Sequence, residues 1–276
     1  MERKNSPLRY PGGKTNLYKS VKTIIDKNHL TDIIYTEPFS GGYGIGLQLM
    51  INGDVQKFII NDYDYHIYAF WKTVFLHTQK LVDFITNVDI TIEEWHKQKE
   101  IYLNYKNHSI IDVGCSTLFL NRTNYSGILK GGPIGGFDQG GEYKINCRFN
   151  KVKIISDIKA IAAHKKQVEI YNLDAIKLIR KLSSREKIFY NFDPPYVQKG
   201  KELYENFYKD VDHIKLHDAI GKFVQDKWIM TYDKCDFIKK LYEGYYIEEY
   251  SLTYVAGEKK KGKEYLISNF NTEEKK

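Results

Sequence analysis

The sequence has little of what marks a secreted, membrane-bound or fibrous protein. Its 276 residues include only 6 prolines and 3 cysteines. No apolar run approaches the roughly 18 residues that cross a membrane, and Met1–Asn5 lacks the apolar stretch of a signal peptide. Cys115, Cys147 and Cys235 lie far apart without metal-ligand spacing, so we expect reduced packing residues and no metal site. These absences favour a soluble globular protein in a reducing compartment, and we expect it in the cytoplasm.

The net charge of the chain is modest but concentrated. The 42 basic and 35 acidic residues leave +7. Residues 97–166 alone carry 12 basic and 5 acidic side chains, which is the same excess, so the rest of the chain is neutral. A local basic excess is typical of a polyanion-binding region. A solvated surface without a partner explains the charge equally well, and the 14% aromatic content does not decide between them.

Alternating apolar segments predict a sheet interleaved with helices. Strands are expected at residues 33–36, 55–60, 168–172, 187–192 and 228–232, and helices at 14–28, 45–51, 175–182, 212–224 and 235–242. Such alternation implies a mostly parallel sheet covered on both faces. Residues 245–252 and 264–270 alternate like a closing hairpin around a lysine-rich turn at 259–263.

The basic middle of the chain interrupts this alternation. Helical periodicity at about 63–86 and 92–105 is followed by an irregular, glycine-rich stretch at 126–141. We therefore predict an inserted, mainly helical subdomain at residues 66–166. Residues 1–65 and 167–276 would together form the main α/β domain.

The segment Asn191–Tyr196 follows an apolar strand and carries the strongest single signal. Two consecutive prolines remove two backbone donors and fix two φ angles, so Asp193 and its neighbouring carbonyls are held rigidly at the carboxyl end of the strand. Open α/β sheets bind ligands at that end. A carboxylate, fixed carbonyls and an adjacent ring suit an exocyclic amine on a stacked base. An exposed Asp-Pro-Pro turn is the alternative for the tetrapeptide alone.

The tetrapeptide Asp193–Tyr196 is similar to the hallmark of amino-methyltransferases that act on nucleic-acid bases. Five further segments resemble those of the Dam-like (D12 class, alpha group) adenine-N6 DNA methyltransferases, in the same order. They are Pro7–Lys14, Glu37–Gly42, Asn61–Asp62, Asn121–Gly127 and Lys263–Phe270. The resemblance spans residues 7–270. It implies a Rossmann-like class I methyltransferase sheet with a target-recognition insertion.

The resemblance implies S-adenosylmethionine as cofactor. It assigns to cofactor binding Tyr10, Lys14, Glu37, Phe39, Ser40, Gly41, Gly42, Asp62, Asp174 and Asp193. Glycines let a backbone approach a ligand closely, and a carboxylate at a strand end suits ribose hydroxyls, the role carried over to Asp62. Lys14 would reach the methionine carboxylate. A solvated lysine is the alternative for Lys14, and a helix cap or turn for Asp62 and Asp174.

The implied reaction needs positioning and electrostatics rather than a covalent nucleophile. The catalytic residues would be Asp193, Pro194, Pro195 and Tyr196. Asp193 and the Pro194 carbonyl would accept hydrogen bonds from the N6 amino group of adenine, so that the nitrogen lone pair points at the methyl group. Because stacking shields N6 inside a duplex, the base must be flipped out, and Tyr196 would stack on it.

The basic insertion would bind double-stranded DNA. The candidates are Arg9, Asn121, Arg122, Asn124, Tyr125, Lys130, Lys144 and Arg148, with Lys151 and Lys153 as further phosphate contacts. The glycine run at 131–136 is expected to be a mobile loop that orders on DNA, or else a passive surface loop. Tyr143–Asn150 departs from the Dam pattern, so GATC is not implied as the target. We expect a monomer; a cognate restriction endonuclease is a further candidate partner.

Other functions remain open at this point. Cytosine-N4 transfer shares the sheet and pocket chemistry, although a serine usually replaces Asp193 there. RNA and protein glutamine are weaker alternatives as substrates. From another class, the chain could be a non-catalytic DNA-binding regulator, although the residues at Tyr10, Lys14, Asp62, Asp193 and Tyr196 argue against lost catalysis.

Overall fold

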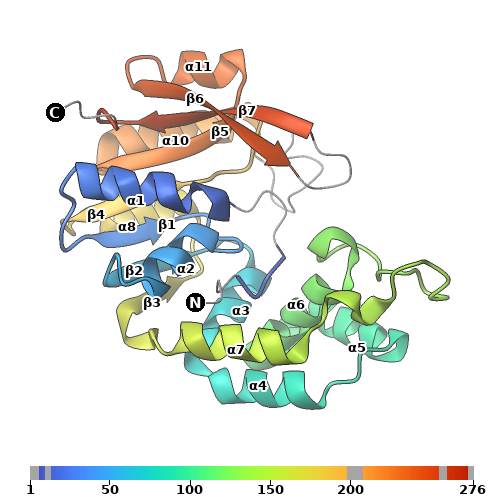
Figure 1. Ribbon diagram of the computed structural model, residues 1–276. Helices are drawn as coiled ribbons and strands as arrows, with labels where there is room; N and C mark the ends of the chain where they lie inside the picture. The colour runs from blue at the N-terminus through green and yellow to red at the C-terminus, as the bar shows by residue number, and fades with distance from the viewer. Residues whose placement is uncertain (1–5, 10–13, 198–207, 255–259, 273–276) are drawn as a thin grey trace.

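The computed structural model describes residues 6–9, 14–197, 208–254 and 260–272 (Figure 1). Within them lies a seven-stranded sheet of order β3-β2-β1-β4-β5-β7-β6. The strands are β1 (Ile34–Glu37), β2 (Lys57–Asn61), β3 (Val168–Tyr171), β4 (Ile188–Phe192), β5 (Trp228–Asp233), β6 (Tyr246–Tyr254) and β7 (Lys260–Ser268). Strands β1 to β5 are parallel, and β7 pairs antiparallel with both β5 and β6. This confirms the predicted α/β sheet, although residues 260–263 belong to β7 and not to a turn.

Side chains alternate between the two faces of the sheet along each strand, and both faces are buried. Phe58, Ile60 and Phe189 lie in one apolar cluster, whereas Ile59 and Tyr190 lie in the other. The first cluster includes α1 (Tyr18–Lys27), which follows a short 3-10 turn, and α2 (Gly44–Ile51). The second includes α8 (Ala175–Leu182), α10 (Asp210–Phe223) and α11 (Asp236–Leu241).

The strand order reverses between β1 and β4, which places a topological switch point at the carboxyl edge of the sheet. From β1 the chain continues to β2 and β3 on one side, whereas β4 and β5 lie on the other. Ligands bind at such a reversal of strand order in open α/β sheets. The last residue of β1, Glu37, and the residue after β4, Asp193, therefore flank the expected binding crevice.

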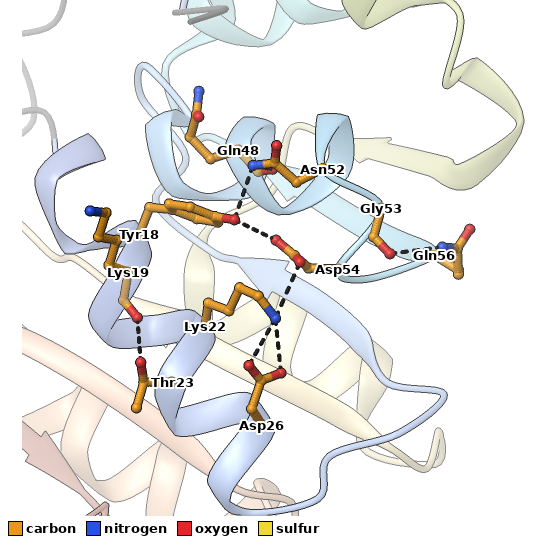
Figure 2. Close-up of polar contacts among 10 residues, drawn as sticks. All are labelled: Tyr18, Lys19, Lys22, Thr23, Asp26, Gln48, Asn52, Gly53, Asp54 and Gln56. Atoms are coloured by element: carbon orange, nitrogen blue, oxygen red, sulfur yellow. Dashed lines mark hydrogen bonds and ion pairs between the residues drawn. The ribbon is translucent and has the colours of Figure 1, made fainter. Parts of the chain in front are cut away.

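Helix α1 is fastened to the turn between α2 and β2 (Figure 2). Asp54 accepts a hydrogen bond from the Tyr18 hydroxyl at 2.7 Å and pairs with Lys22 at 3.3 Å. Lys22 also binds Asp26, one turn further along the helix. A pocket of about 420 Å³ adjoins this turn at the amino end of the sheet, opposite to the crevice. It is lined by Asp26, Asp54 and residues 29–33, among others.

Five helices lie between β2 and β3 in the chain. They are α3 (Tyr65–Leu76), α4 (Thr78–Asn87), α5 (Ile92–Leu103), α6 (Ile110–Thr123) and α7 (Lys151–Ala162). Figure 1 shows them gathered below and beside the β3 edge of the sheet, and α3 contacts β3. The single helix predicted at 63–86 is wrong, because His77 leaves helical geometry with φ −130° and ψ 34° and separates α3 from α4.

Helices α6 and α7 lie outside the helical segments expected from periodicity. The buried residues of α6 cover almost its whole circumference, so no apolar stripe marks it. Its start does carry a local signal, a capping box in which Ser109 and Asp112 bind each other's backbone N–H groups. Cys147, expected to pack, is exposed, whereas Cys115 is buried. None of the helices in the described residues is long and apolar enough to cross a membrane.

The glycine-rich stretch between α6 and α7 is irregular, as predicted, but it is held by hydrogen bonds. Gln139 donates to the carbonyls of Ile134 and Gly136 at 2.9 and 2.6 Å. Its Oε1 accepts from the Ile145 N–H at 2.8 Å. Gln139 therefore ties residues 134–145 into one closed loop. Whether this loop moves on DNA stays a prediction.

Gly114 provides a test of the packing between α3 and α6. A Cβ atom at Gly114 would lie 2.2 Å from Thr73 Oγ1 and 2.8 Å from the Ala69 carbonyl oxygen, which is backbone and cannot rotate away. We expect Gly114→Ala to destabilise the protein by about 1–3 kcal/mol, because overpacking outweighs the gain in helix propensity. Chemical denaturation measures the effect.

Gly221 in α10 is the matched control. It is exposed, and an added Cβ would meet only the Tyr245 hydroxyl at an ordinary 3.7 Å. Gly221→Ala should stabilise the protein by about 0.5–1 kcal/mol. Equal effects of the two substitutions would contradict the close α3–α6 contact.

Candidate active site

Acidic side chains from three neighbouring strands lie at the carboxyl edge of the sheet. Glu37 ends β1, Asp62 follows β2, and Asp193 follows β4. These three were predicted from sequence as site residues, and the parallel register of β2, β1 and β4 brings them to the same edge. The three carboxylates differ in their hydrogen-bond partners and in the charges around them.

Asp193 is held from two sides and remains partly accessible. The Thr231 hydroxyl on β5 donates to Asp193 Oδ1 at 2.7 Å, and the Lys14 ammonium lies 3.9 Å from the same oxygen. The Asp193 side chain is 28% exposed. Burial raises the pKa of Asp193, while the positive charge of Lys14 and the bond from Thr231 oppose the rise. Asp193 is thus a fixed hydrogen-bond acceptor at the crevice.

Lys14 is buried beneath Asp193 rather than solvated. Its ammonium donates to the hydroxyl of Tyr196 and, at 2.7 Å, to Glu264 Oε2 on β7. The Tyr196 hydroxyl in turn donates to Glu264 at 2.9 Å. The hydroxyl of Tyr250 on β6 also donates to Glu264. Glu264 and Tyr250 were not among the sequence candidates. The only available signal was a glutamate at the start of an otherwise apolar terminal segment.

Tyr196 is almost completely covered, with 5% of its surface exposed. Burial and the nearby carboxylates raise its pKa well above the usual range. Of the two prolines before it, Pro194 is buried and Pro195 is half-buried. The ring of Tyr196 is therefore packed into the protein beside Asp193 in this structure.

The turn between β1 and α2 is shaped by backbone bonds to β2. Gly41 has φ 44°, a conformation that glycine tolerates, and its N–H donates to Asp62 Oδ2 at 2.8 Å. The Ser40 N–H donates to the Asn61 carbonyl, and the Gly41 carbonyl accepts from the Trp71 indole on α3. This turn, which also contains buried Gly42, is thereby fixed against the end of β2.

Asp62 completes the turn and its pKa is strongly shifted. Besides Gly41, its carboxylate accepts from the Asp64 N–H at 2.9 Å. Burial, followed by the negative charge of Asp64, raises the pKa of Asp62 to about 7. Asn61 beside it is fully buried, and its side chain bonds the Pro38 and Leu173 backbones. Sequence reasoning had assigned a role to Asp62 alone and had missed the structural role of Asn61.

Glu37 lies under the turn and supports it. Its Oε1 accepts from the Tyr35 hydroxyl at 2.8 Å and from the Gly46 N–H at 3.2 Å. Burial raises the pKa of Glu37 to about 8. Phe39 packs edge-on against Tyr208, with ring centroids 5.9 Å apart.

Asp174 caps α8 by accepting from the N–H groups of Ile176 and Lys177. The helix-cap alternative thus describes its observed contacts. Tyr10, also assigned to the cofactor, lies outside the described residues.

The residues around the turn fit an adenosyl cofactor. Within the part of the chain that the structure describes, the hydroxyls of Ser40 and Tyr43 are buried without a hydrogen-bond partner. Orphaned buried hydroxyls carry a desolvation cost that a polar ligand can relieve. Asp62 adds a carboxylate acceptor, and Phe39 adds an aromatic ring beside the turn.

Two of the predicted DNA-binding residues form hydrogen bonds within the protein. Asn121 accepts from the Arg9 N–H at 2.7 Å and donates to the carbonyls of Arg9 and Gly127. Asn124 accepts from the Trp95 indole at 2.6 Å and donates to the carbonyls of residues 128 and 129. Both asparagines are buried, so they shape the loop and hold Arg9 in place.

The other DNA-binding candidates differ in how far they are exposed. Arg122 donates to the Pro7 carbonyl at 2.6 Å, and burial lowers its pKa to about 10. Lys151 donates to the carbonyls of Thr86 and Val88 at the end of α4, and Lys153 pairs with buried Asp157. The exposed candidates are Tyr125, Lys130, Lys144 and Arg148, with Tyr125 72% exposed.

The sheet order, the glycine turn bonded to an acidic residue after β2, and the Asp-Pro-Pro-Tyr segment after β4 together define a Rossmann-like methyltransferase. The family profile of the D12 class N6 adenine-specific DNA methyltransferases matches residues 10–256. The chain belongs to this family. It is also similar to the type II methyltransferase M.CviBI of Paramecium bursaria Chlorella virus NC1A. The two are 24% identical over 258 residues, which cover 90% of each chain.

The raised pKa of Glu37 predicts how stability depends on pH. Its pKa is about 8 in the folded protein and near 4.5 when unfolded, so folding favours the protonated form. The resulting stability is fully present below about pH 4.5 and is lost as pH rises toward 8. Glu37→Gln removes this loss. Relative to the parent, the variant should gain on the order of 2 kcal/mol between pH 5.5 and 8.

Denaturant melts at both pH values measure this difference. Exposed Glu243 is the matched control, and Glu243→Gln should leave the parent's pH dependence in place. A Glu37→Gln protein with the same pH dependence as the parent would contradict the assignment.

Proposed function

We propose that this protein is a site-specific DNA adenine-N6 methyltransferase that uses S-adenosylmethionine. The observation that carries the proposal is Asp193, a partly accessible carboxylate fixed by Thr231 and Lys14 beside the glycine turn. Membership of the D12 family supports adenine N6 as the acceptor. Residues 66–166 would form the target-recognition subdomain, inserted into a catalytic domain made of residues 1–65 and 167–276.

The turn between β1 and α2 would hold the cofactor. S-adenosylmethionine supplies a methyl group activated by a sulfonium charge. Asp62 would accept hydrogen bonds from the ribose hydroxyls, the Ser40 hydroxyl would gain a partner, and Phe39 would pack on the adenine ring. Lys14 would act on Asp193 and not bind the methionine carboxylate, because its ammonium already donates hydrogen bonds to Glu264 and Tyr196.

Asp193 would act as the acceptor for the amino group of a flipped adenine. With the Pro194 carbonyl it would draw the N6 hydrogens and turn the nitrogen lone pair toward the methyl group. The buried cation at 3.9 Å favours the ionised form of Asp193, which this role requires. Stacking by Tyr196 requires its ring, now 5% exposed, to be uncovered when the base enters.

A direct test combines product analysis with Asp193 variants. Purified protein, double-stranded genomic DNA and labelled S-adenosylmethionine should yield N6-methyladenine, identified by mass spectrometry of the nucleosides. Asp193→Ala and Asp193→Asn should lower kcat at least about 10³-fold, because a preorganised acceptor is lost, while the Kd for DNA changes little. Label on cytosine N4 would overturn the choice of base, and substantial turnover by both variants would overturn the mechanism.

The exposed cations of the insertion should set the salt dependence of DNA binding. Replacing Lys130 and Arg148 by Gln removes two exposed charges near the α6–α7 loop. If both contact phosphates, the slope of log K against log salt should become shallower by about 2.

The matched control replaces Lys239 and Lys240, which are equally exposed but lie on α11, outside the basic region at residues 97–166. Fluorescence anisotropy at several salt concentrations measures both slopes. Equal changes in the two double variants would assign the basic excess to general surface charge.

A further inference from the structure

Glu264 is a fully buried carboxylate that no step of the proposed reaction uses. Its exposed fraction is 0%, yet it accepts hydrogen bonds from Lys14, Tyr196 and Tyr250. These three donors come from the amino-terminal segment, the segment after β4, and β6. A carboxylate bound by three donors from separate parts of the chain can fix their relative positions.

The sheet holds Glu264 firmly. In the register of the closing strands, Glu264 on β7 lies opposite Asp233 of β5 and Tyr250 of β6. It is therefore paired on both sides and is not at a sheet edge. Its place beside the ammonium of Lys14 is set by backbone pairing, so that Lys14 is positioned by the sheet and not by a mobile loop.

The charges around Asp193 show what Glu264 does for that carboxylate. Lys14 lies between the two acidic groups, at 2.7 Å from Glu264 and 3.9 Å from Asp193. Without Glu264, the ammonium would lose its nearest acidic partner. A buried charge that loses its partner is costly, so the ammonium would turn toward Asp193 and bind it directly. The acceptor oxygen of Asp193 would then be occupied.

We propose that Glu264 is a positioning residue, which holds Lys14 at the distance where its charge keeps Asp193 ionised but leaves Asp193 free to accept a hydrogen bond. Through the Tyr196 hydroxyl it also sets the orientation of the Tyr196 ring. The proposal assigns the closing hairpin β6–β7 to the reaction and rests on the proposed function.

The pH profile separates this role from plain structural support. The charged and titratable groups that face Asp193 are Lys14, Glu37, Tyr196 and Glu264. The negative charge of Glu264 raises the pKa of Asp193. Glu264→Gln removes that charge, so the pKa of Asp193 should fall.

Activity requires ionised Asp193, so the acidic limb of kcat against pH should move to lower pH by about half a unit or more. In the same variant kcat should fall at least about tenfold, with the Kd for DNA unchanged.

Glu249 is the matched control on the same hairpin. It is exposed and pairs with Lys234 on the surface. Glu249→Gln should keep the parental kcat and pH profile. The proposal fails if Glu264→Gln, shown to be folded by circular dichroism, keeps the parental acidic limb, or if both variants change it equally.

A second measurement needs no turnover. Thermal melts of Lys14→Met, Glu264→Gln and the double variant, without cofactor, form a double-mutant cycle. Each single variant removes the nearest opposite charge from a buried charged group, so the double variant should lose less than the sum of the singles by about 3 °C or more. Additive losses would overturn the buried pair. If the parent protein methylates no DNA, the proposed function fails, while this cycle still decides whether Glu264 holds Lys14.

Discussion

The site depends on one buried ammonium group shared between carboxylates from distant parts of the chain. Lys14 precedes the first helix, Asp193 follows β4, and Glu264 lies on the last strand. Removing charges from water costs free energy, and the cost is offset only when oppositely charged partners arrive together. The amino-terminal segment, the segment after β4 and the closing hairpin therefore have to assemble as a unit. The antiparallel hairpin thus contributes a buried carboxylate to a site that lies at the ends of the parallel strands.

The asparagines of the site illustrate a different constraint. Asn61 and Asn121 each use both ends of the side-chain amide to satisfy backbone groups where regular secondary structure stops. Asn124 donates to two backbone carbonyls and accepts from the Trp95 indole. Irregular backbone near a binding surface leaves N–H and C=O groups unpaired, and a short amide can donate and accept at once. Such residues fall within the motifs that mark a binding site in the sequence, yet they act by holding Arg9 and the turns in place.

The local sequence pattern was sufficient to predict the sheet and its ligand-binding edge, but it did not predict the contacts between distant segments. Apolar runs marked every strand within a few residues, and the acidic residues Asp62 and Asp193 after strands marked the ligand edge. The break at His77 has no proline or glycine to announce it, and α6 is too uniformly buried to show a helical stripe. The role of Glu264 could not be read locally, because its partner Lys14 is 250 residues away. Nor could the local count of charges separate exposed Arg148 from Lys153, which is paired with Asp157.

The electrostatics of the crevice restrict what can bind there. Burial raises the pKa values of Glu37, Asp62 and Asp193 together, so the protein without ligand holds carboxyl groups that resist ionisation. A ligand that brings hydrogen-bond donors or positive charge lowers those pKa values and is stabilised in return, whereas an anionic ligand would raise them further. Ribose hydroxyls, an exocyclic amine and a sulfonium all belong to the favoured kind. The acidic edge of the sheet thus selects for donor-rich ligands. Under the proposed function, the phosphates of a nucleic acid would be contacted instead by exposed cations such as Arg148.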